Sequence, residues 1–408
     1  MDKLVASGGQ KNSGTRSANA VRGTLAGFCA SLVGIGLARF AYTPLLPAIV
    51  DAHWFDPSQA AYLGAANLAG YLIGALAGRP IAAGDRSAIC LRGMMILATV
   101  AFFACAQPAS FIWFFVWRLL SGMAGGVLMV LAAPAVLPLV RPARRGLASG
   151  VIFMGVGVGI VASGTLVPLL LEQGLRDTWL GMGVISLALT AIAWNGWPSQ
   201  AAVPKPHPHP RRASGNRLLR ALYVEYALNA VGWVPHMIFL VDFVAHGLGK
   251  GLQVGAEHWV LFGIGATVGP VLSGMLADTV GFGRALRTSF VLEAVAVAVP
   301  ACGLNMVWLM VSSVVVGAIV TGTVPLVLGR LHELLAHHPA QQIPAWSTAT
   351  IGFALCQALA AYGLTFVFSA SGGDYGLLFT IGSAAIVLAL ATDFIGTSAA
   401  RHEATQDG

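Results

Sequence analysis

The sequence predicts an all-α polytopic membrane protein whose twelve transmembrane helices form two pseudo-symmetric six-helix bundles. Three observations support this fold class. Of the 408 residues, 57% are hydrophobic and only 10% are charged, whereas a soluble domain carries about 25% charged residues. The chain divides into twelve apolar runs, and a single long polar stretch separates six of them from the other six.

Each apolar run is long enough to be a membrane span, since a crossing needs about 20 mostly apolar residues. Gly and Pro are abundant in these runs, as they are in membrane helices. The predicted spans, in chain order, lie near residues 24–50, 58–78, 90–107, 111–140, 147–171, 178–197, 218–243, 258–277, 287–304, 306–331, 343–369 and 374–397.

The distribution of Lys and Arg predicts the orientation of these spans. With both termini on the cytoplasmic side, the cytoplasmic segments hold nineteen of the 23 Lys and Arg residues. The positive-inside rule therefore predicts a multi-pass membrane protein with both termini cytoplasmic. We expect it to lie in the bacterial inner membrane. The net charge of +7 is spread over short loops, so it does not indicate a nucleic-acid partner.

The domain organisation follows from the one long polar stretch. It contains Pro204-Lys-Pro-His-Pro-His-Pro-Arg-Arg212, a composition typical of a stiff and solvated linker. Gly74-Ala-Leu-Ala77 recurs as Gly274-Met-Leu-Ala277 in the second half, and such parallel repeats occur in secondary transporters. The predicted units are a disordered cytoplasmic tail (1–20), a six-helix bundle (21–197), a linker (198–216), a second bundle (217–398) and a tail (399–408).

Arg39 is the most informative residue, because it lies near the middle of the first predicted span. A guanidinium group at that depth costs about 3 kcal/mol unless it has a partner, water or an anionic ligand. We therefore expect Arg39 to line a substrate cavity. The alternative is a structural role, in which Arg39 forms an ion pair or binds backbone carbonyl groups.

Helical spacing places further polar residues, together with some glycines, on one face of their predicted helix. Such stripes in apolar helices should face protein or water rather than lipid. The stripe in the first span is Ser31, Arg39, Tyr42 and Thr43, and the stripe in the fourth is Arg118, Gly122 and Gly125. The stripe in the seventh span is Glu225, Asn229, Gly232 and His236, and the stripe in the tenth is Ser313, Gly317 and Thr321. From these stripes we expect Tyr42, Thr43, Arg118, Asn229 and His236 to line the substrate cavity with Arg39.

Glu225 is the candidate for proton coupling, because a carboxyl group in a low-dielectric cavity can be protonated reversibly near neutral pH. Glu225 could instead extend to the cytoplasm from its position near the start of the seventh span. Arg118 could instead anchor its helix, and His236 could be a hydrogen-bonded buried histidine. Glu293 is expected to pair with an arginine on the cytoplasmic side, such as Arg287.

The loop after the eighth span carries a further motif. Gly274-Met-Leu-Ala-Asp278-Thr-Val-Gly281-Phe-Gly-Arg284 is similar to the signature loop of the major facilitator superfamily. There Gly permits close packing and a turn, and Asp and Arg lie at helix ends. The first half departs from the motif, because Gly78 stands where the loop's Asp would be.

Two further segments carry the resemblance across the chain. Arg118-Leu-Leu-Ser-Gly122-Met-Ala-Gly-Gly126 looks like the second motif of the superfamily. Gly34-Ile-Gly-Leu-Ala-Arg39-Phe-Ala-Tyr-Thr-Pro-Leu-Leu-Pro47 resembles the first span of its YbfB/YjiJ subfamily. The resemblance implies a secondary transporter that alternates access between two faces. It also implies that the first, fourth, seventh and tenth spans surround the cavity and that Gly274, Asp278, Gly281 and Arg284 form a gating loop.

Other chemistries are not encoded by recognisable motifs. His332-Glu333-Leu-Leu-Ala-His337 resembles a zinc-protease helix, but a spacing of five turns the second ring about 140° from the first, whereas a metal pair needs four. We expect a solvated loop there. No Gly-rich loop ends in Lys-Ser or Lys-Thr, so we expect no nucleotide-driven motor. We expect no enzyme activity, catalytic residue, metal or cofactor.

The sequence thus predicts a secondary active transporter for a small organic solute, driven by a gradient, with protons as the coupling ion. The two deep arginines favour an anionic or amphiphilic solute. The expected partners are the solute, the lipid bilayer and protons, and we expect a monomer to be functional. The alternative from another class is a non-transporting membrane sensor or scaffold built on a carrier fold.

Overall fold

A computed structural model describes residues 18–81, 86–198 and 217–406. Every regular element within these ranges is helical. Eleven helices of the described chain are long and apolar enough to cross a membrane, and α4 contributes a shorter apolar helix, Tyr62–Gly78. The predicted all-helical fold with twelve spans is confirmed.

The first half of the chain supplies the first six spans. The first span begins with a helix over residues 18–31 and continues through a π-helical segment, η1, and two short helices. The elements are η1 (Leu32–Leu37), α2 (Ala38–Phe40), α3 (Tyr42–Asp51), α4 (Pro57–Ile81), α5 (Ser87–Ala104), α6 (Phe111–Val136), η2 (Leu137–Leu139), η3 (Pro142–Arg144), α7 (Arg145–Leu171) and α8 (Leu175–Ala193).

The second half supplies the other six spans, and its first one is also interrupted, at Trp233. Its elements are α9 (Arg217–Gly232), α10 (Val234–Asp242), η4 (Phe243–Gly247), α11 (Leu252–Val280), α12 (Phe282–Ala298), η5 (Val299–Cys302), α13 (Met306–Leu334), α14 (Pro339–Ala370) and α15 (Tyr375–Gln406).

The ends of the helical chain differ from the predicted units. Helix is already present at residues 18–20, within the predicted tail 1–20. At the other end α15 continues to Gln406 and takes up most of the predicted tail 399–408. The rest of the first tail and most of the linker 198–216 lie outside the described residues.

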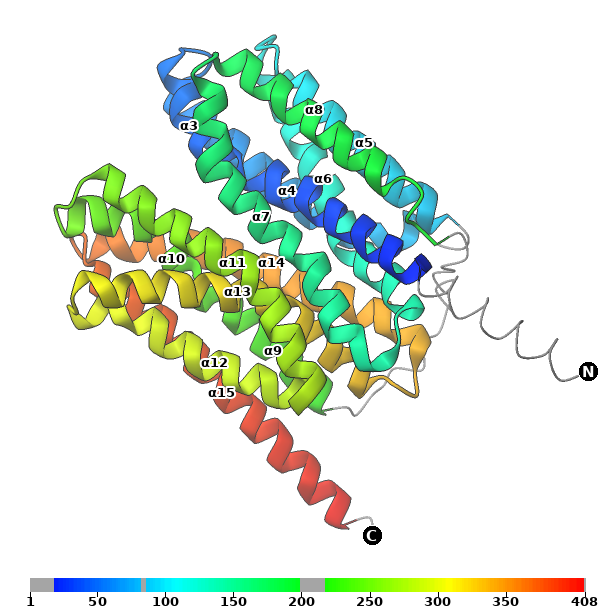
Figure 1. Cartoon of the computed structure of the whole chain (residues 1–408). Coiled ribbons are helices and arrows are strands. Elements are labelled where there is room, and N and C mark those ends of the chain that lie inside the picture. The colour runs from blue at the N-terminus through cyan, green and yellow to red at the C-terminus, as the bar shows by residue number, and fades with distance from the viewer. Residues whose placement is uncertain (1–17, 82–85, 199–216, 407–408) are drawn as a thin grey trace, which may run out of the picture.

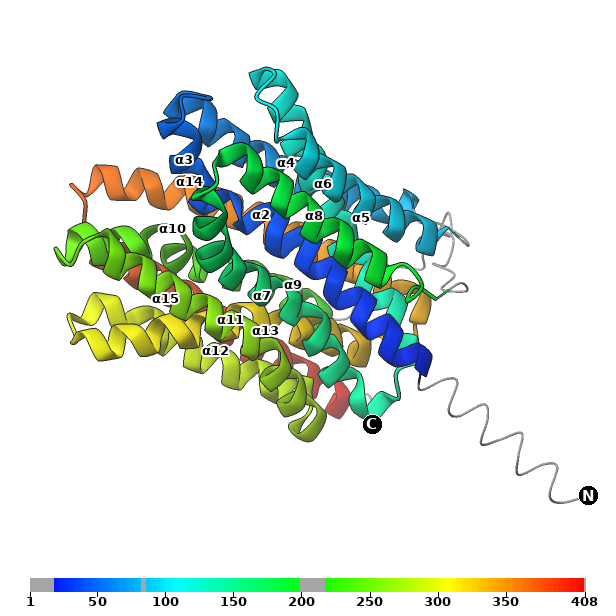
Figure 2. The ribbon, with the colours of Figure 1, turned by 45° about the horizontal axis from the view of Figure 1, so that its top comes forward.

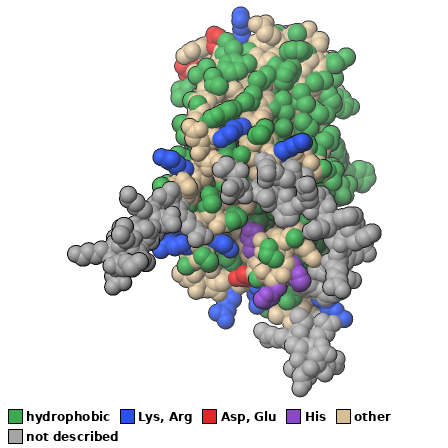
Figure 3. Space-filling model, turned by 90° about the vertical axis from the view of Figure 1, so that its right-hand side faces the viewer, with side chains coloured by type: hydrophobic (Ala, Val, Ile, Leu, Met, Phe, Trp, Pro, Cys, Tyr) green, Lys and Arg blue, Asp and Glu red, His purple; other side chains and the backbone are tan. Residues whose placement is uncertain are grey.

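The two halves form two bundles that lie side by side, as Figures 1 and 2 show by the change of colour from blue and green to yellow and red. The start of the first span and the end of α15 lie at the same end of the molecule (Figure 1). We call this end the terminal face. Figure 3, which views the molecule from that side, shows Lys and Arg side chains spread around it.

Glycine contacts hold each bundle together in the same way. In the first bundle a Cβ atom at Gly126 of α6 would collide with the carbonyl oxygen of Tyr71 of α4. In the second bundle a Cβ atom at Gly317 of α13 would collide with the carbonyl oxygen of Phe262 of α11. Membrane helices associate through small residues that let their backbones approach closely. The shared pattern supports the internal repeat that the sequence suggested.

The halves meet along α7 and α11, again through glycine. Cβ atoms at Gly150 and Gly157 of α7 would collide with the backbone of Pro270 and Ala266 of α11. The contact therefore runs along much of both helices and fixes the distance between the bundles. This close approach positions the cavity that lies between them.

This packing predicts a marked effect of one methyl group. We expect Gly126→Ala to lower the stability of the protein by about 1–3 kcal/mol, because the added carbon forces α4 and α6 apart. The midpoint of thermal unfolding in detergent would measure it. Gly93→Ala is the matched control, because nothing lies within 4 Å of the added carbon there. Equal midpoints for the two variants would contradict this account of the packing.

Candidate functional site: a cavity between the two halves

A cavity of about 60 Å³ lies between the two bundles. That volume holds a few water molecules and is well below the 300–1,000 Å³ of a typical ligand pocket. Both halves line it, and seven of its fifteen lining residues are aromatic. The lining residues are Ile35, Arg39, Phe40, Tyr71, Met129, Phe153, Val156, Ile160, Tyr226, Trp233, Phe262, Val320, Thr321, Val324 and Phe353.

The first, fourth, seventh and tenth spans all contribute to this lining, as the resemblance implied. Arg39 is the one cationic side chain among the lining residues. The cavity therefore combines a single positive charge with an extended apolar and aromatic wall.

Arg39 bonds across the interface between the halves. Its Nη2 donates to Oε1 of Gln357 in α14 over 2.9 Å. Its guanidinium group also lies 5.3 Å from the ring centre of Phe40 and 5.8 Å from that of Tyr71, which is within range of a cation–π attraction. Among the described residues, no carboxylate forms an ion pair with Arg39. Its charge is thus held by neutral groups and stays available to an anion.

The local structure of the first span presents Arg39 to the cavity. The π-helical turn η1 ends two residues before it, and such turns contain one extra residue and are frequent at functional sites. Gly36 within η1 has no room for a Cβ atom against Gly159 of α7. The extra residue turns the side chains that follow it, while the glycine contact keeps the widened turn against its neighbours.

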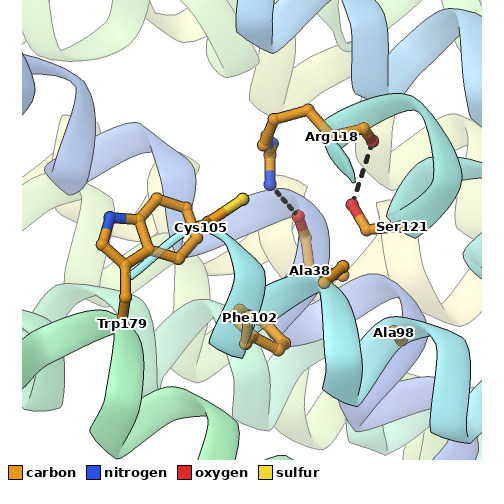
Figure 4. Close-up of a pocket in the computed structure, with 8 residues that line it drawn as sticks. Ala38, Ala98, Phe102, Cys105, Arg118, Ser121 and Trp179 are labelled. Atoms are coloured by element: carbon orange, nitrogen blue, oxygen red, sulfur yellow. Dashed lines mark hydrogen bonds between the residues drawn. The ribbon is translucent and has the colours of Figure 1, made fainter. Parts of the chain in front are cut away.

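Arg118 lies inside the first bundle rather than in the central cavity. Its Nη1 donates to the carbonyl oxygen of Ala38 over 2.8 Å, and its guanidinium group lies 4.2 Å from the ring centre of Tyr42. Figure 4 shows it with Phe102, Cys105 and Trp179 around a narrow gap within this bundle that is too small for a water molecule. Because Ala38 precedes Arg39, Arg118 fixes the backbone from which Arg39 extends.

Tyr42 and Thr43 also lie away from the central cavity. The Tyr42 hydroxyl donates to the carbonyl oxygen of Ala60 over 2.7 Å and so joins the first span to α4. Thr43 is exposed. The contacts of Tyr42 with Ala60 and Arg118 hold its side chain inside the first bundle, so the predicted stripe does not continue as a face of the cavity beyond Arg39.

The polar stripe of the seventh span faces the interior of the second bundle. Asn229 and His236 are fully buried, and Glu225 is 2% exposed. Gly232, within the same stripe, packs against Ile386 of α15. The cavity instead receives Tyr226 and Trp233 of this span. A glycine within a polar stripe indicates that this face of the helix packs against a neighbouring helix. Gly232 was therefore the feature of the sequence that could have shown that the stripe faces the bundle interior rather than the cavity.

Aromatic residues that the sequence did not single out form the wall of the cavity on the side of the second bundle. Tyr226 lies 4.5 Å from Phe353 of α14 between ring centres. Trp233 stacks on Phe262 of α11 at 6.4 Å. The spacing of seven between Tyr226 and Trp233 places them on one helical face, which is the face that meets the first bundle.

Glu293 and Arg287 do not form the expected pair. Glu293 is fully buried and accepts a hydrogen bond from Asn229. Arg287 pairs with Asp393 of α15 and donates to Thr397 of the same helix. The expectation was therefore wrong, because α12 points these two side chains in different directions.

The predicted gating loop connects the two halves at the terminal face. Asp278 of α11 accepts hydrogen bonds from the amides of Gly146 and Leu147, each over 2.9 Å. These amides belong to the first turn of α7. A carboxylate there satisfies two unpaired N–H groups and opposes the positive end of the helix dipole. Asp278 thus caps a helix of the other bundle.

The other motif residues have simpler roles. Gly274 touches the backbone of Gly146 at a point that leaves no room for a Cβ atom. Gly281 joins α11 to α12 with a φ of 88°, a conformation that favours glycine. Arg284 is exposed in the first turn of α12, where the helix dipole does not favour a cation.

The corresponding contact of the first half uses neutral groups. Gly78 carries no side chain that could cap α14, in line with the departure of this half from the motif. Instead Ser347 Oγ of α14 donates to the carbonyl oxygen of Ala75, and Trp346 Nε1 donates to that of Met129, each over 3.1 Å. The Asp278 contact between the halves is therefore charged, whereas the corresponding contact of α14 consists of two neutral hydrogen bonds.

A second cavity, of about 200 Å³, lies between the halves near these contacts, and its lining includes Arg145, His332 and Glu333. The last two residues belong to α13, which extends to Leu334, so the solvated loop expected at this motif is in part helical. Glu333 pairs with Arg330 over 2.9 Å. Within the described ranges, no group of three or more His, Cys, Asp or Glu residues could hold a metal ion.

The fold has close counterparts among solved structures. The proton:xylose symporter XylE superposes with a TM-score of 0.71 at 13% identity and covers 92% of this chain and 95% of its own. The human organic anion transporter MFSD10 superposes with a TM-score of 0.69 at 18% sequence identity, and the match covers 91% of this chain and 99% of MFSD10. The E. coli fucose:proton symporter FucP superposes with a TM-score of 0.70 at 13% sequence identity, and the match covers 91% of this chain and 98% of FucP.

These likenesses concern the fold, and the sequence itself identifies the family. Residues 31–394 match the family model described as the uncharacterised MFS-type transporter YbfB. That match extends over most of both bundles and includes Arg39, Gln357 and Asp278. The chain therefore belongs to the YbfB-type family of major facilitator superfamily transporters.

Proposed function

We propose that this protein carries a small organic anion with an apolar or aromatic body across the bacterial inner membrane by alternating access. The observation that supports this proposal most directly is Arg39. It is a cation without a carboxylate partner among the described residues, and it lies in a cavity with an aromatic wall between the two halves. An ionised carboxylate would bind the guanidinium group through two parallel hydrogen bonds.

The hydrogen bond between Arg39 and Gln357 joins the two halves, so a solute that binds Arg39 would affect both of them. Gln357 accepts a hydrogen bond with a neutral oxygen, whereas a carboxylate gives a stronger, charge-assisted bond. An arriving anion would therefore displace Gln357 and remove one bond between the bundles. In the proposed cycle this loosens the interface at the solute and lets the halves rearrange around it.

We further propose that the terminal face is cytoplasmic, as the distribution of Lys and Arg favours. The contacts of Asp278, Ser347 and Trp346 then close the cytoplasmic side in this state. Both halves of the cavity come from one chain, which supports a functional monomer. Protons are the proposed coupling ion, and the buried Glu225 is the candidate that binds them on the cytoplasmic side.

The role of Arg39 predicts selective binding of acids. We expect benzoate to raise the unfolding temperature of the wild-type protein, whereas benzamide, its neutral counterpart of similar shape, leaves it unchanged. An acid at 100 times its dissociation constant stabilises the folded state by about 2.7 kcal/mol. Thermal unfolding with a panel of such acid and amide pairs would measure the effect.

Arg39→Gln should abolish the preference for the acid. Arg92→Gln is the matched control, because Arg92 stacks on Trp194 within the first bundle and lies outside the cavity lining. If Arg39→Gln responds to the acids as the wild type does, Arg39 is not the anion site.

The role of Glu225 predicts a loss of coupling. In proteoliposomes, adding an acid that stabilises the protein should drive proton movement through the wild type and not through Glu225→Gln, because an amide cannot bind a proton at neutral pH. A pH-sensitive dye in the lumen would measure it. Proton movement at the wild-type rate in Glu225→Gln would remove Glu225 from the coupling mechanism.

The role of Asp278 predicts a shift between the two states. Asp278→Asn loses the charge and one of the two acceptors, which should weaken the closed cytoplasmic side by about 1–2 kcal/mol. Spin labels at the exposed residues Ala143 and Thr279 would then report an additional, longer distance. Asp374→Asn is the control, since Asp374 accepts from the amide of Leu377 at the other end of its bundle. Identical distance distributions for the two variants would refute the gating role.

A further inference from the structure

The second bundle contains a carboxyl group that the carrier scheme leaves without a role. Glu293 of α12 is fully buried, outside the lining of the solute cavity. Its Oε2 accepts a hydrogen bond from Asn229 Nδ2 of α9 over 2.5 Å. Among the residues that the structure describes, its Oε1 has no hydrogen-bond partner, and neither has Oδ1 of Asn229. The pair is thus incompletely bonded in a region that excludes water.

The charged and titratable groups on the helices around α12 are not bonded to Glu293 among the described residues. Arg287 on the same helix pairs with Asp393 of α15, and Arg330 pairs with Glu333 on α13. Glu225 and His236 lie on the seventh span, and His332 lies on α13. On α11 the titratable groups are Glu257, His258 and Asp278. In the part of the chain that the structure describes, none of these side chains is hydrogen-bonded to Glu293.

This environment fits a neutral carboxylic acid. An ionised carboxylate would be an isolated buried charge with one hydrogen bond, which is strongly unfavourable. Glu293 therefore holds a proton in the state described here. Loss of that proton requires water or a cation to reach the carboxylate, and both require α9 and α12 to separate at this point.

The same contact lies beside the interruption of the seventh span. Asn229 precedes the break at Trp233 by one turn, and His236 follows it. His236 Nε2 bonds to Ser312 Oγ over 2.9 Å, and Ser312 in turn donates to the carbonyl oxygen of Ala296 in α12 over 2.6 Å. Both sides of the break are thus connected to α12, while Trp233 itself lines the solute cavity.

A path from Glu293 toward the terminal face follows one side of α9. Glu225 lies one turn before Asn229 on α9 and is buried. The pair formed by Arg287 and Asp393 is partly exposed, with 28% and 13% of the side-chain surfaces accessible. Once α9 and α12 separate and admit water, Glu225 would be the next carboxyl group along α9 toward the terminal face that can accept a proton from Glu293.

We propose that Glu293 and Asn229 form a proton-binding site inside the second bundle, separate from the solute cavity and connected to it through the break in the seventh span. The proposal deepens the proposed carrier function and rests on it for its role in transport. Protonation at Glu293 keeps α9 against α12 and Trp233 in the cavity wall. Release of the proton to Glu225 frees the seventh span to move.

Infrared spectroscopy of the full chain in lipid bilayers tests the site without a solute. The test is made in a Glu225→Gln background, which removes the other buried carboxyl group of the second bundle described above. At neutral pH this protein should show the carbonyl-stretch band of a protonated carboxylic acid, and adding Glu293→Gln should remove that band. Glu257→Gln is the matched control, because Glu257 is exposed, and it should retain the band. Asn229→Ala should shift the band without removing it, which keeps the test decisive if Glu293→Gln does not fold.

A band that persists when Glu293→Gln is added to Glu225→Gln, or that is already absent from Glu225→Gln alone, overturns the proposal. The infrared experiment measures no transport, so it tests the proton site even if the proposed carrier function is wrong. Spin labels at Ala143 and Thr279 test the connection to the interface: their distance distribution should change between acidic and alkaline buffer in the wild type and stay constant in Glu293→Gln. A variant that responds to pH as the wild type does would refute the connection.

Discussion

The positive charge of Arg39 is the constraint on which the arrangement of the two halves depends. A guanidinium group at this depth costs about 3 kcal/mol without partners, and the structure meets that cost with an amide oxygen and two aromatic rings. None of these groups neutralises the charge. Because Gln357 belongs to the other half, the hydrogen bond that stabilises Arg39 also joins the bundles.

Much of the fold could be predicted from the sequence, because span length, hydropathy and the placement of Lys and Arg depend on local composition. The twelve spans and the division into two halves follow from such properties. The position of Arg39 in the cavity could also be predicted, since an isolated deep cation has few alternatives. These conclusions need no knowledge of how the helices are rotated about their axes.

The candidate site could be predicted only in part, because its composition depends on that rotation. The stripes of Arg118 and of Glu225 contain glycines, and both stripes turn toward neighbouring helices of their own bundle, where a small residue allows close contact. Tyr226 and Trp233 were not singled out, although a spacing of seven places both on the face that meets the first bundle. A glycine within a polar stripe thus indicates packing, and paired aromatic residues indicate the cavity.

The two bundles divide the chemistry unequally despite their shared architecture. In the first bundle, Arg118 holds the carbonyl oxygen of Ala38, so the backbone beneath Arg39 is fixed while its head group stays free to exchange partners. In the second bundle, the buried carboxyl group of Glu225 lies on the span that is interrupted at Trp233, and that of Glu293 lies beside this span.

If the first half recognises the anion and the second half binds the proton, the two events can influence each other only through groups that both halves share. Gln357, which contacts Arg39, and Trp233, which lines the same cavity, are such groups. Coupling in this carrier would then be a property of the wall between the bundles rather than of either bundle alone.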